Sequence, residues 1–344
     1  MMDKMDNQIN IALESFSQDN RDEWLLGIEE GLRSLLGTPV IFTRHRKDTK
    51  PLLGWPGAWG PEPVDFGPSG EVVRLAAVDS SCRRVAETRE GTVYAVRGAL
   101  VEAEGGRFVG FRRFGPLLYH LTPSTCERLV GRTPYSRSLS KLIQVEPAIA
   151  ESFLRRRMER LIQHEAVEGG VGLLLVDGSL RTSRFDDAGL DLRSLVEKAE
   201  RMGASVVGIS KTTRLKVLTR CIGRISLHGR APSLVDVKDE MGIFGENLVG
   251  HPYIVRFSLY GDPLRVDVAS RLDATRVLGS LLANDQISAG YPESLRLAHH
   301  LSVLRDADIA CIEGFMVGRL GVEPYPALDA RLPFLQDLPG ALRH

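Results

Sequence analysis

The apolar run at residues 171–177 (VGLLLVD) constrains the fold more than any other segment of the chain. A strand with this sequence is apolar on both faces, which is typical of a strand at the centre of a sheet covered on both sides. Residues 205–210 (SVVGIS) have the same character, and helical patterns at 147–164 and 190–202 precede the two strands. This alternation predicts a sheet with parallel strands at its centre.

Three further strand-like segments precede the first of these helices. They lie at 72–79, 92–101 and 107–114, close enough along the chain to form an antiparallel meander, and an irregular polar stretch follows them. A meander, then a helix, then a parallel central strand is the order of the ribonuclease H-like fold. The expected fold class is therefore α/β, a ribonuclease H-like mixed sheet flanked by helices, which by itself assigns no function.

The second half of the chain adds a hairpin and two helices. A turn at Gly261-Asp262 joins strands at 253–260 and 264–269, and helical spacing follows at 271–283 and 292–305. The 292–305 segment begins with Pro292, which suits the first turn of a helix. We expect both helices to pack on the sheet.

The ends of the chain differ from its middle. Residues 7–37 have a mostly helical spacing that stops at Gly37 and predicts an N-terminal helical arm over 1–50. Ten of the twenty residues from 51 to 70 are Gly or Pro and predict a long loop. Residues 71–320 form the ribonuclease H-like domain, and 321–344 a C-terminal extension. Trp55 and Trp59 either pin the loop to its own domain or form a docking patch for a partner.

Composition excludes several classes of protein. The longest stretch without charged or bulky polar side chains, 169–176, is far shorter than the roughly 20 residues of a membrane span, and no secretory signal is evident, so we expect a cytoplasmic protein. Four cysteines without a C-x-x-C pair indicate ordinary thiols. With 44 basic and 44 acidic residues, net charge neither favours nor excludes nucleic acid as a partner.

Two predicted strands end in an aspartate followed by small residues, at Asp79 (AAVDSS) and Asp177 (LLLVDGS). If the strands are neighbours, the two carboxylates face each other, and a divalent cation would relieve their repulsion. Oxygen ligands without a Cys or His cluster favour Mg²⁺ or Mn²⁺ over zinc. In the alternative interpretation, each aspartate caps the turn that follows it.

A third carboxylate is expected on the intervening helix, where Glu151, Glu159 and Glu165 are candidates. At 100° per residue, Glu165 falls near the middle of the apolar arc, Glu151 at its edge and Glu159 on the opposite side. This predicts that Glu159 is not buried in the core. Spacing alone does not rank the three as metal ligands.

The ordered set of motifs resembles the NurA nuclease family. The matching pieces are V-D-S-S at Asp79, Met-Glu at Glu159, L-V-D-G-S-L at Asp177, G-I-S-K at Lys211, and the Y-P-x-x-L-x-x-A-H segment at 291–299. They extend from about residue 70 to 315. Where many members have Asp-Gly-Ser, this chain has Asp79-Ser80-Ser81, which leaves the carboxylate in place.

The resemblance implies a DNA nuclease that depends on manganese, with magnesium as a possible substitute. It implies exonuclease activity with single-strand endonuclease activity, a homodimer, and partnership with a HerA-type hexameric ATPase translocase in DNA end resection and repair. Asp79, Glu159 and Asp177 match the metal-binding acids of the family, with Glu151 as the alternative to Glu159. Two cations roughly 4 Å apart would support phosphodiester hydrolysis.

The resemblance also assigns Tyr291 and His299 to the site. If both lie on one helix, eight residues separate them by about 12 Å, so they would contact successive parts of a DNA strand. We expect His299 to orient or protonate at the scissile phosphate, and Tyr291 to pack on or hydrogen-bond to the nucleotide. Packing roles in the core are the alternative, and His300 competes with its neighbour.

Basic residues are candidates for contacts with the DNA backbone. Lys211 follows the buried strand at 205–210, Arg214 continues the basic series, and Arg156 lies on the helix that carries Glu159. Two other functions fit the sequence: an ATP phosphotransferase of the same fold, which lacks its expected glycine-rich signature, and a non-catalytic DNA clamp or adaptor.

Overall fold

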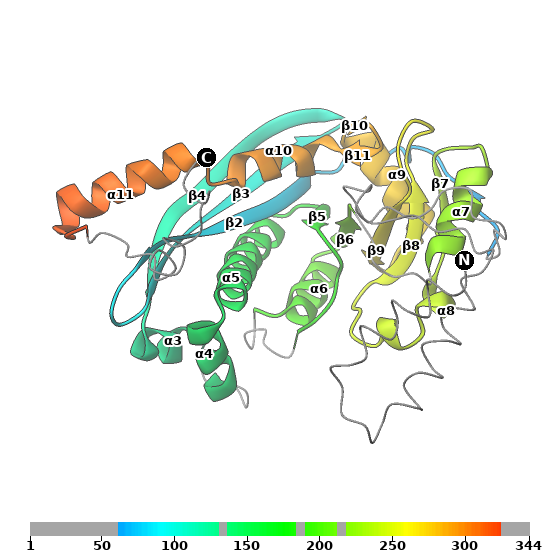
Figure 1. The fold of residues 1–344 in the computed structure, drawn as a ribbon. Helices are drawn as coiled ribbons and strands as arrows, with labels where there is room; N and C mark the ends of the chain where they lie inside the picture. Colours follow the sequence, from blue (N-terminus) through cyan, green and yellow to red (C-terminus); the bar gives the residue numbers. More distant parts are fainter. Residues whose placement is uncertain (1–60, 131–135, 184–189, 212–217, 325–344) are drawn as a thin grey trace, which may run out of the picture. The chain divides into compact units, whose positions relative to one another are not determined.

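A computed structural model of the chain describes residues 61–130, 136–183, 190–211 and 218–324 (Figure 1). The expected helical arm at 1–50, most of the Gly/Pro-rich loop with Trp55 and Trp59, and residues 325–344 lie outside the described residues. Within them, no helix has both the length and the apolar character needed to cross a membrane.

A nine-stranded sheet forms the centre of the described part, in the order β1-β7-β8-β9-β6-β5-β2-β3-β4. Strand β5 pairs in parallel with β2 and with β6, and every other pair in this sheet is antiparallel. The bounds are β1 Val64–Asp65, β2 Leu75–Glu87, β3 Thr92–Glu104, β4 Arg107–Leu121, β5 Leu173–Asp177, β6 Ser205–Ser210, β7 Ser233–Asp236, β8 His251–Arg256 and β9 Leu264–Ala269. The order β4-β3-β2-β5-β6 confirms the predicted ribonuclease H-like arrangement.

Helices cover both faces of this sheet (Figure 1). One face packs against α3 Pro123–Val130, α4 Ser136–Val145, α5 Pro147–Glu168 and α6 Leu192–Arg201, and the other against α9 Ala274–Asn284 and α10 Glu293–Ser302. Helices α7 Thr219–Leu227 and α8 Lys238–Met241 cover the β7–β8 side, followed by a 3-10 turn at Gly242–Gly245. Helix α11, Asp306–Leu320, lies beyond α10, and a small hairpin of β10 Ile287–Ser288 and β11 Tyr291–Pro292 precedes α10.

Several predicted boundaries are wrong. The stretch after the meander is not irregular, because it forms α3 and α4, which pack on α5. Strand β2 does not end at Asp79 but continues to Glu87, because it still pairs with β3 after its pairing with β5 has stopped. The part of the predicted loop at 61–70 contains the short strand β1.

The alternation of side chains along the strands separates the two cores. On β2, Leu75 and Ala77 belong to the core under α9 and α10, whereas Ala76 and Val78 belong to the core under α5 and α6. Since successive side chains of a strand point to opposite faces, the side chain of Asp79 points to the α10 face of the sheet, like those of Leu75 and Ala77. Strand β5 repeats the pattern, with Leu173 and Leu175 on the α10 side, so Asp177 also falls on that side.

Helix α5 approaches the sheet closely at Gly98 on β3. A Cβ atom at this position would lie 2.3 Å from Cδ1 of Ile162 and 2.9 Å from Cγ of Met158. Gly98 is the register partner of Ser80 on β2. The absence of a side chain at Gly98 therefore allows α5 to pack closely on β3, beside the strand β2 that carries Asp79.

We predict that Gly98→Ala lowers the free energy of unfolding by about 1–3 kcal/mol, because the added methyl group overpacks the α5–β3 contact. Urea denaturation followed by circular dichroism measures the change. Gly110→Ala is the matched control, since Gly110 also lies in the meander and a Cβ there would meet nothing within 4 Å. Equal stability of the two variants would contradict the close packing.

Candidate active site

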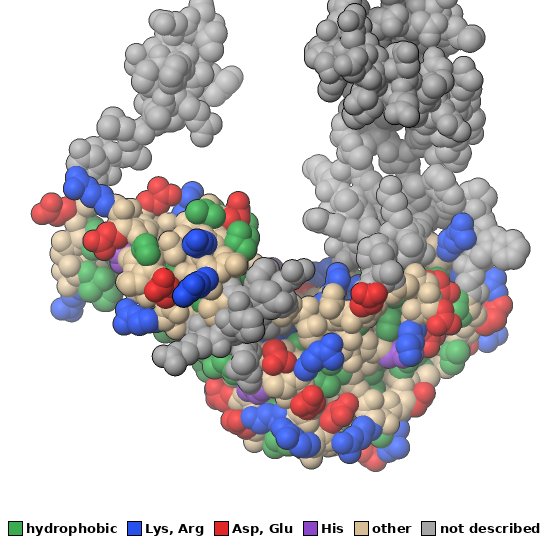
Figure 2. All heavy atoms as spheres, turned by 90° about the horizontal axis from the view of Figure 1, so that it is seen from below, with side chains coloured by type: hydrophobic (Ala, Val, Ile, Leu, Met, Phe, Trp, Pro, Cys, Tyr) green, Lys and Arg blue, Asp and Glu red, His purple; other side chains and the backbone are tan. Residues whose placement is uncertain are grey.

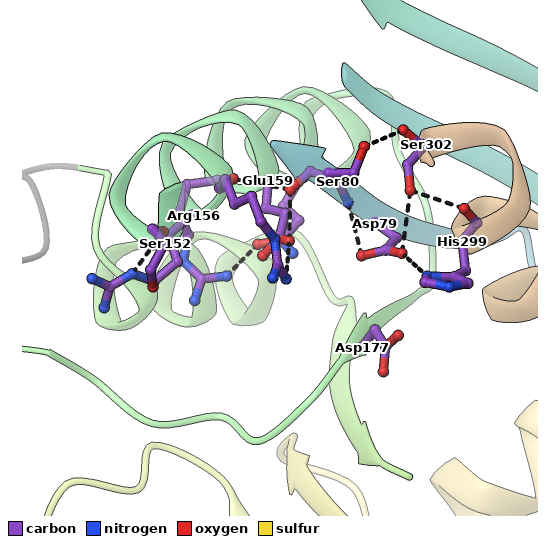
Figure 3. Close-up of polar contacts among 12 residues, drawn as sticks. Asp79, Ser80, Ser152, Arg156, Glu159, Asp177, His299 and Ser302 are labelled. Atoms are coloured by element: carbon purple, nitrogen blue, oxygen red, sulfur yellow. Dashed lines mark hydrogen bonds and ion pairs between the residues drawn. The ribbon is translucent and has the colours of Figure 1, made fainter. Parts of the chain in front are cut away.

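Two aspartates from neighbouring parallel strands form the centre of the site (Figure 3). The last register pair of β2 and β5 is Val78 with Val176, so Asp79 and Asp177 follow it on the two strands. Their side chains are 5% and 19% exposed, respectively. One candidate ligand atom from each of Asp79, Asp177 and His299 lies within 4.8 Å of the others, so the predicted convergence of the two acids occurs.

Asp79 is held from its own strand and from α10. The backbone N–H of Ser80 donates to Oδ1 at 2.8 Å, and His299 Nδ1 lies 2.7 Å from Oδ2. The hydroxyl of Ser302 donates to Oδ2 at 3.3 Å, and Ser81 bonds to the backbone carbonyl of Ser302. These contacts fix the carboxylate against the C-terminal turn of α10.

Asp177 is held by the residue that follows β6 and by the small hairpin. Lys211 Nζ donates to Oδ2 at 2.6 Å, and the hydroxyl of Tyr291 donates to Oδ1 at 3.3 Å. The Lys211 ammonium also lies 5.2 Å from the centre of the Tyr291 ring. Burial raises the pKa of Tyr291, and the negative charge of Asp177 raises it further. The phenol therefore stays protonated and can donate a hydrogen bond to the carboxylate of Asp177.

Tyr291 does not lie on the helix that carries His299, contrary to the prediction. It belongs to β11, and the turn before it places Ala289 (φ 50°) and Gly290 (φ 76°) in the left-handed region, as a tight two-residue hairpin turn requires. Gly290 also lies against Gly261, where a Cβ on Gly261 would approach its Cα to 2.5 Å. The hairpin therefore brings Tyr291 to Asp177 while α10 brings His299 to Asp79.

The loop after Asp177 is fixed by a buried ion pair. Both carboxylate oxygens of Asp267 accept bonds from the Arg265 guanidinium at 3.0 Å, and Oδ2 also accepts the backbone N–H of Leu180 at 2.9 Å. The loop crosses β6 at Gly208, where a Cβ would lie 2.7 Å from the carbonyl oxygen of Gly178. The position of Asp177 thus depends on a fixed loop as well as on its strand.

Glu159 lies on α5, on the side of β2 opposite to Asp79. Its Oε1 accepts the hydroxyl of Ser80 at 2.8 Å and lies 3.6 Å from the Arg155 guanidinium. Burial raises the pKa of Glu159, an effect that Arg155 and the Ser80 bond oppose. The structure does not place Glu159 in the group formed by Asp79, Asp177 and His299, although Ser80 joins it to Asp79 (Figure 3).

The predicted orientation of α5 is wrong. Glu159 is 9% exposed, whereas Glu165, placed by its spacing in the apolar arc, is exposed and pairs with Arg112. The reason is that the buried side of α5 includes polar residues such as Gln163, while Leu161 is 46% exposed. A prediction from the apolar positions alone therefore assigns the wrong buried face to this helix.

Glu151 lies away from Asp79, farther along β2. Its charge acts on Cys82, whose pKa is raised to about 12, mainly by burial and also by this carboxylate. Cys82 follows Ser80 on the α5 side of the strand. Among the three helix glutamates, Glu159 is thus the one hydrogen-bonded to the residue beside Asp79.

The basic candidates are distributed unevenly. Lys211 lies in the site as the partner of Asp177, whereas Arg156 lies on α5, where its Nε donates to the Ser152 carbonyl at 3.3 Å. Arg214 falls outside the described residues. His300 is exposed, and its ring lies 6.1 Å from that of His299. All four cysteines are free thiols, as predicted.

Sequence reasoning missed the serines that organise the acids. Ser80 bridges Asp79 and Glu159, and Ser302 supports Asp79 from α10. The signal for Ser80 was present, since adjacent residues of a strand face opposite sides and Ser80 must face the helix that follows the meander. No local pattern indicates Ser302, because its partner is more than 200 residues away in sequence.

We predict that Ser80→Ala destabilises the fold by about 1–3 kcal/mol, because the buried Glu159 carboxylate loses its hydroxyl donor. The effect should largely disappear when Glu159→Ala is already present, which a double-mutant cycle of urea unfolding measures. Ser152→Ala, an exposed change on the same helix, should stay within about 0.5 kcal/mol of the parent. Additive effects of the two site substitutions would contradict the proposed link.

Comparisons with known proteins agree with the resemblance seen in the sequence. The chain matches the NurA domain family over residues 73–304. It is similar to the crystal structure of the NurA nuclease from Sulfolobus solfataricus, with 15% identity and a TM-score of 0.49, covering 90% of this chain and 100% of that one. No curated protein matches the chain.

Structures of endonuclease V are also similar to the chain. The human enzyme has 17% identity and a TM-score of 0.36, covering 73% of this chain and 93% of its own. The Ciona intestinalis enzyme, bound to DNA containing inosine, has 13% identity and a TM-score of 0.37, covering 68% and 86%. Since the family match extends over more than half of the sequence and includes Asp79, Glu159, Asp177, Tyr291 and His299, the chain belongs to the NurA nuclease family.

Proposed function

We propose that the protein is a metal-dependent DNA nuclease, an exonuclease with single-strand endonuclease activity. The observation that carries the proposal is the convergence of Asp79, Asp177 and His299 within 4.8 Å, from three elements far apart in sequence. Such a group matches what phosphodiester hydrolysis needs, because negative charge develops on the phosphate and on the leaving oxygen.

The donor set fits a hard divalent cation. The two carboxylates suit Mn²⁺, and Mg²⁺ is the natural substitute, whereas a zinc site of the usual kind would draw on Cys or several His. When bound, such a cation supplies an activated water and stabilises charge on phosphate oxygens. The two-cation form of the proposal requires Glu159 to exchange its bond with Ser80 for a cation.

The remaining side chains position groups and move protons. Because His299 Nδ1 faces Asp79, its Nε2 is the atom that can exchange a proton with water or the leaving oxygen, and the side chain is 48% exposed. Lys211 balances the charge of Asp177 and lies where it can meet a phosphate oxygen. Tyr291 orients Asp177 through its hydroxyl, and its expected contact with the nucleotide remains part of the proposal.

Membership of the family supports the wider proposals of a homodimer, a HerA-type hexameric translocase as partner, and a role in DNA end resection and repair. Acidic and basic side chains are mixed over the described part of the face in Figure 2, and the net charge of the chain is zero. A ring-shaped partner would supply part of the DNA path. Sedimentation of the protein with and without purified translocase tests both assemblies.

We predict that the purified protein cuts labelled single- and double-stranded DNA with Mn²⁺ and not with EDTA. Asp79→Asn and Asp177→Asn should each lower the rate by more than about 100-fold, because each removes a charged ligand. Asp239→Asn is the control, since this aspartate is exposed on α8. Circular dichroism verifies that the variants remain folded.

Three results would contradict the proposal. Cutting that persists in both site variants would separate the activity from these carboxylates. ATP turnover without DNA cutting would favour the phosphotransferase of the same fold, and DNA retention without cutting, unchanged in Asp177→Asn, would favour a clamp or adaptor.

We predict that Tyr291→Phe lowers Mn²⁺ affinity or the cleavage rate by about 10-fold, because Asp177 loses a hydroxyl donor that orients it. Calorimetric titration with Mn²⁺ and steady-state cleavage measure the two effects. Tyr253→Phe on β8 is the matched control, since the Tyr253 ring stacks on His251 and, among the described residues, it is Tyr291 and not Tyr253 that hydrogen-bonds to Asp177. Indistinguishable behaviour of the two variants would remove Tyr291 from the site.

A further inference from the structure

Three consecutive carbonyl groups between α10 and α11 accept hydrogen bonds from side chains of the meander. The contacts are, in order, Ser81 with the carbonyl of Ser302, Arg97 with that of Val303, and Arg83 with that of Leu304. Val303 caps the C-terminus of α10, and α11 begins at Asp306. Because the last carbonyls of a helix have no partner within the helix, side chains that bind this segment fix where α10 ends.

The guanidinium of Arg97 is buried and binds both sides of this segment. Arg97 is 5% exposed, donates to the Val303 carbonyl at 3.2 Å, and pairs with Asp308 of α11 at 2.7 Å. Asp308 also accepts the backbone N–H of Arg305 at 2.8 Å. The bonds from Arg97 and Arg305 lower the pKa of Asp308 to about 2, so the ion pair stays charged at neutral pH. One side chain of β3 thus holds the end of α10 and the start of α11.

Apolar contacts already dock α11 on the meander. Ile312 and Met316 are buried in one core cluster with Val93 and Ala95 of β3. Burying a charge is costly, and apolar side chains can often replace a buried ion pair without loss of stability. A guanidinium is directional, however, because its N–H groups lie in a fixed planar fork. Arg97 is therefore better suited to fixing geometry than to packing α11.

The segment that Arg97 holds lies one helical turn from His299. The backbone N–H of Val303 donates to the carbonyl of His299 at 3.1 Å, and His299 reaches Asp79 from this end of α10 (Figure 3). Asp79 lies on the same strand as Ser81, which is the register partner of Arg97. A displacement of Val303 would therefore move the imidazole relative to the carboxylate.

We infer that Arg97 is a positioning residue of the candidate active site: through the Val303 carbonyl it fixes the end of α10 and holds the His299 imidazole against Asp79. The inference rests on the proposed nuclease function for its effect on DNA cleavage, and it deepens that function by naming a residue that acts through the backbone of α10. The contact between the imidazole and the carboxylate can be measured without DNA and without metal.

Nuclear magnetic resonance of the full chain with isotope-labelled histidine, in EDTA, measures the contact between His299 and Asp79. Comparison with the spectrum of His299→Gln identifies the signals of His299. In the parent protein, the Nδ1 proton bound to Asp79 should give a low-field signal that exchanges slowly with water. Arg97→Ala should lose this signal. Ser81→Ala, which releases the neighbouring carbonyl of the same segment, should lose it as well.

Met316→Ala is the matched control, because it also loosens α11 but leaves the contacts of Val303 in place. It should keep the His299 signal, although it unfolds at a lower urea concentration than the parent. In DNA cleavage, Arg97→Ala and Ser81→Ala should each lower kcat by about 10- to 100-fold. The KM for DNA should stay unchanged, since Arg97 acts on the reacting groups and not on DNA binding. Met316→Ala should keep the kcat of the parent.

A His299 signal that persists in Arg97→Ala would overturn the inference, and if that variant does not fold, Ser81→Ala is judged by the same criterion. Loss of the signal in Met316→Ala would also overturn it, because Arg97 would then act only as a support for α11. Loss of the signal in the two site variants, in a protein whose parent cuts no DNA, would uphold the positioning role and reject the nuclease. Cleavage by the parent, with the signal unchanged in the variants, would do the reverse.

Discussion

The site depends on the short parallel ladder between β2 and β5. Four register pairs, from Leu75 with Leu173 to Val78 with Val176, set the two strands side by side and in phase. Because both strands alternate their side chains in the same register, Asp79 and Asp177 emerge together on the α10 face. Each carboxylate has its own partner, which offsets the repulsion between the two negative charges: His299 contacts Asp79, and Lys211 contacts Asp177.

Much of the fold could be predicted because its central elements have strong patterns. Strand β6 has the bounds that its sequence predicts, and α5 begins at Pro147, where Glu146 caps the helix. Helices α3 and α4 were missed because they are short and polar on one side, and their apolar residues pack only once α5 is in place. The continuation of β2 past Asp79 was missed because the pairing of Ser80 to Glu87 with β3 is a tertiary property of the meander.

The site was predictable to the extent that it follows strand alternation. Asp79 and Asp177 were found from their strands, whereas the face of Glu159 was misjudged because α5 is covered from more than one side and buries polar groups such as Gln163. The role of Lys211 beside Asp177 could not be predicted, since it depends on the register of β6 against β5. Local sequence indicates which residues lie at the end of a strand, whereas the tertiary structure of the sheet determines which of these residues are in contact.

The two aspartates differ in the backbone that follows them. Asp177 ends its strand and Asp267 holds Leu180 soon after it, so the chain that follows Leu180 could lengthen or shorten without moving the carboxylate. Asp79 lies within a strand of thirteen residues, so one inserted residue behind it would turn every later side chain to the opposite face, exchanging the partners of Ser80 and Ser81. Relatives of this protein should accordingly vary in length after the second carboxylate and keep a fixed length after the first.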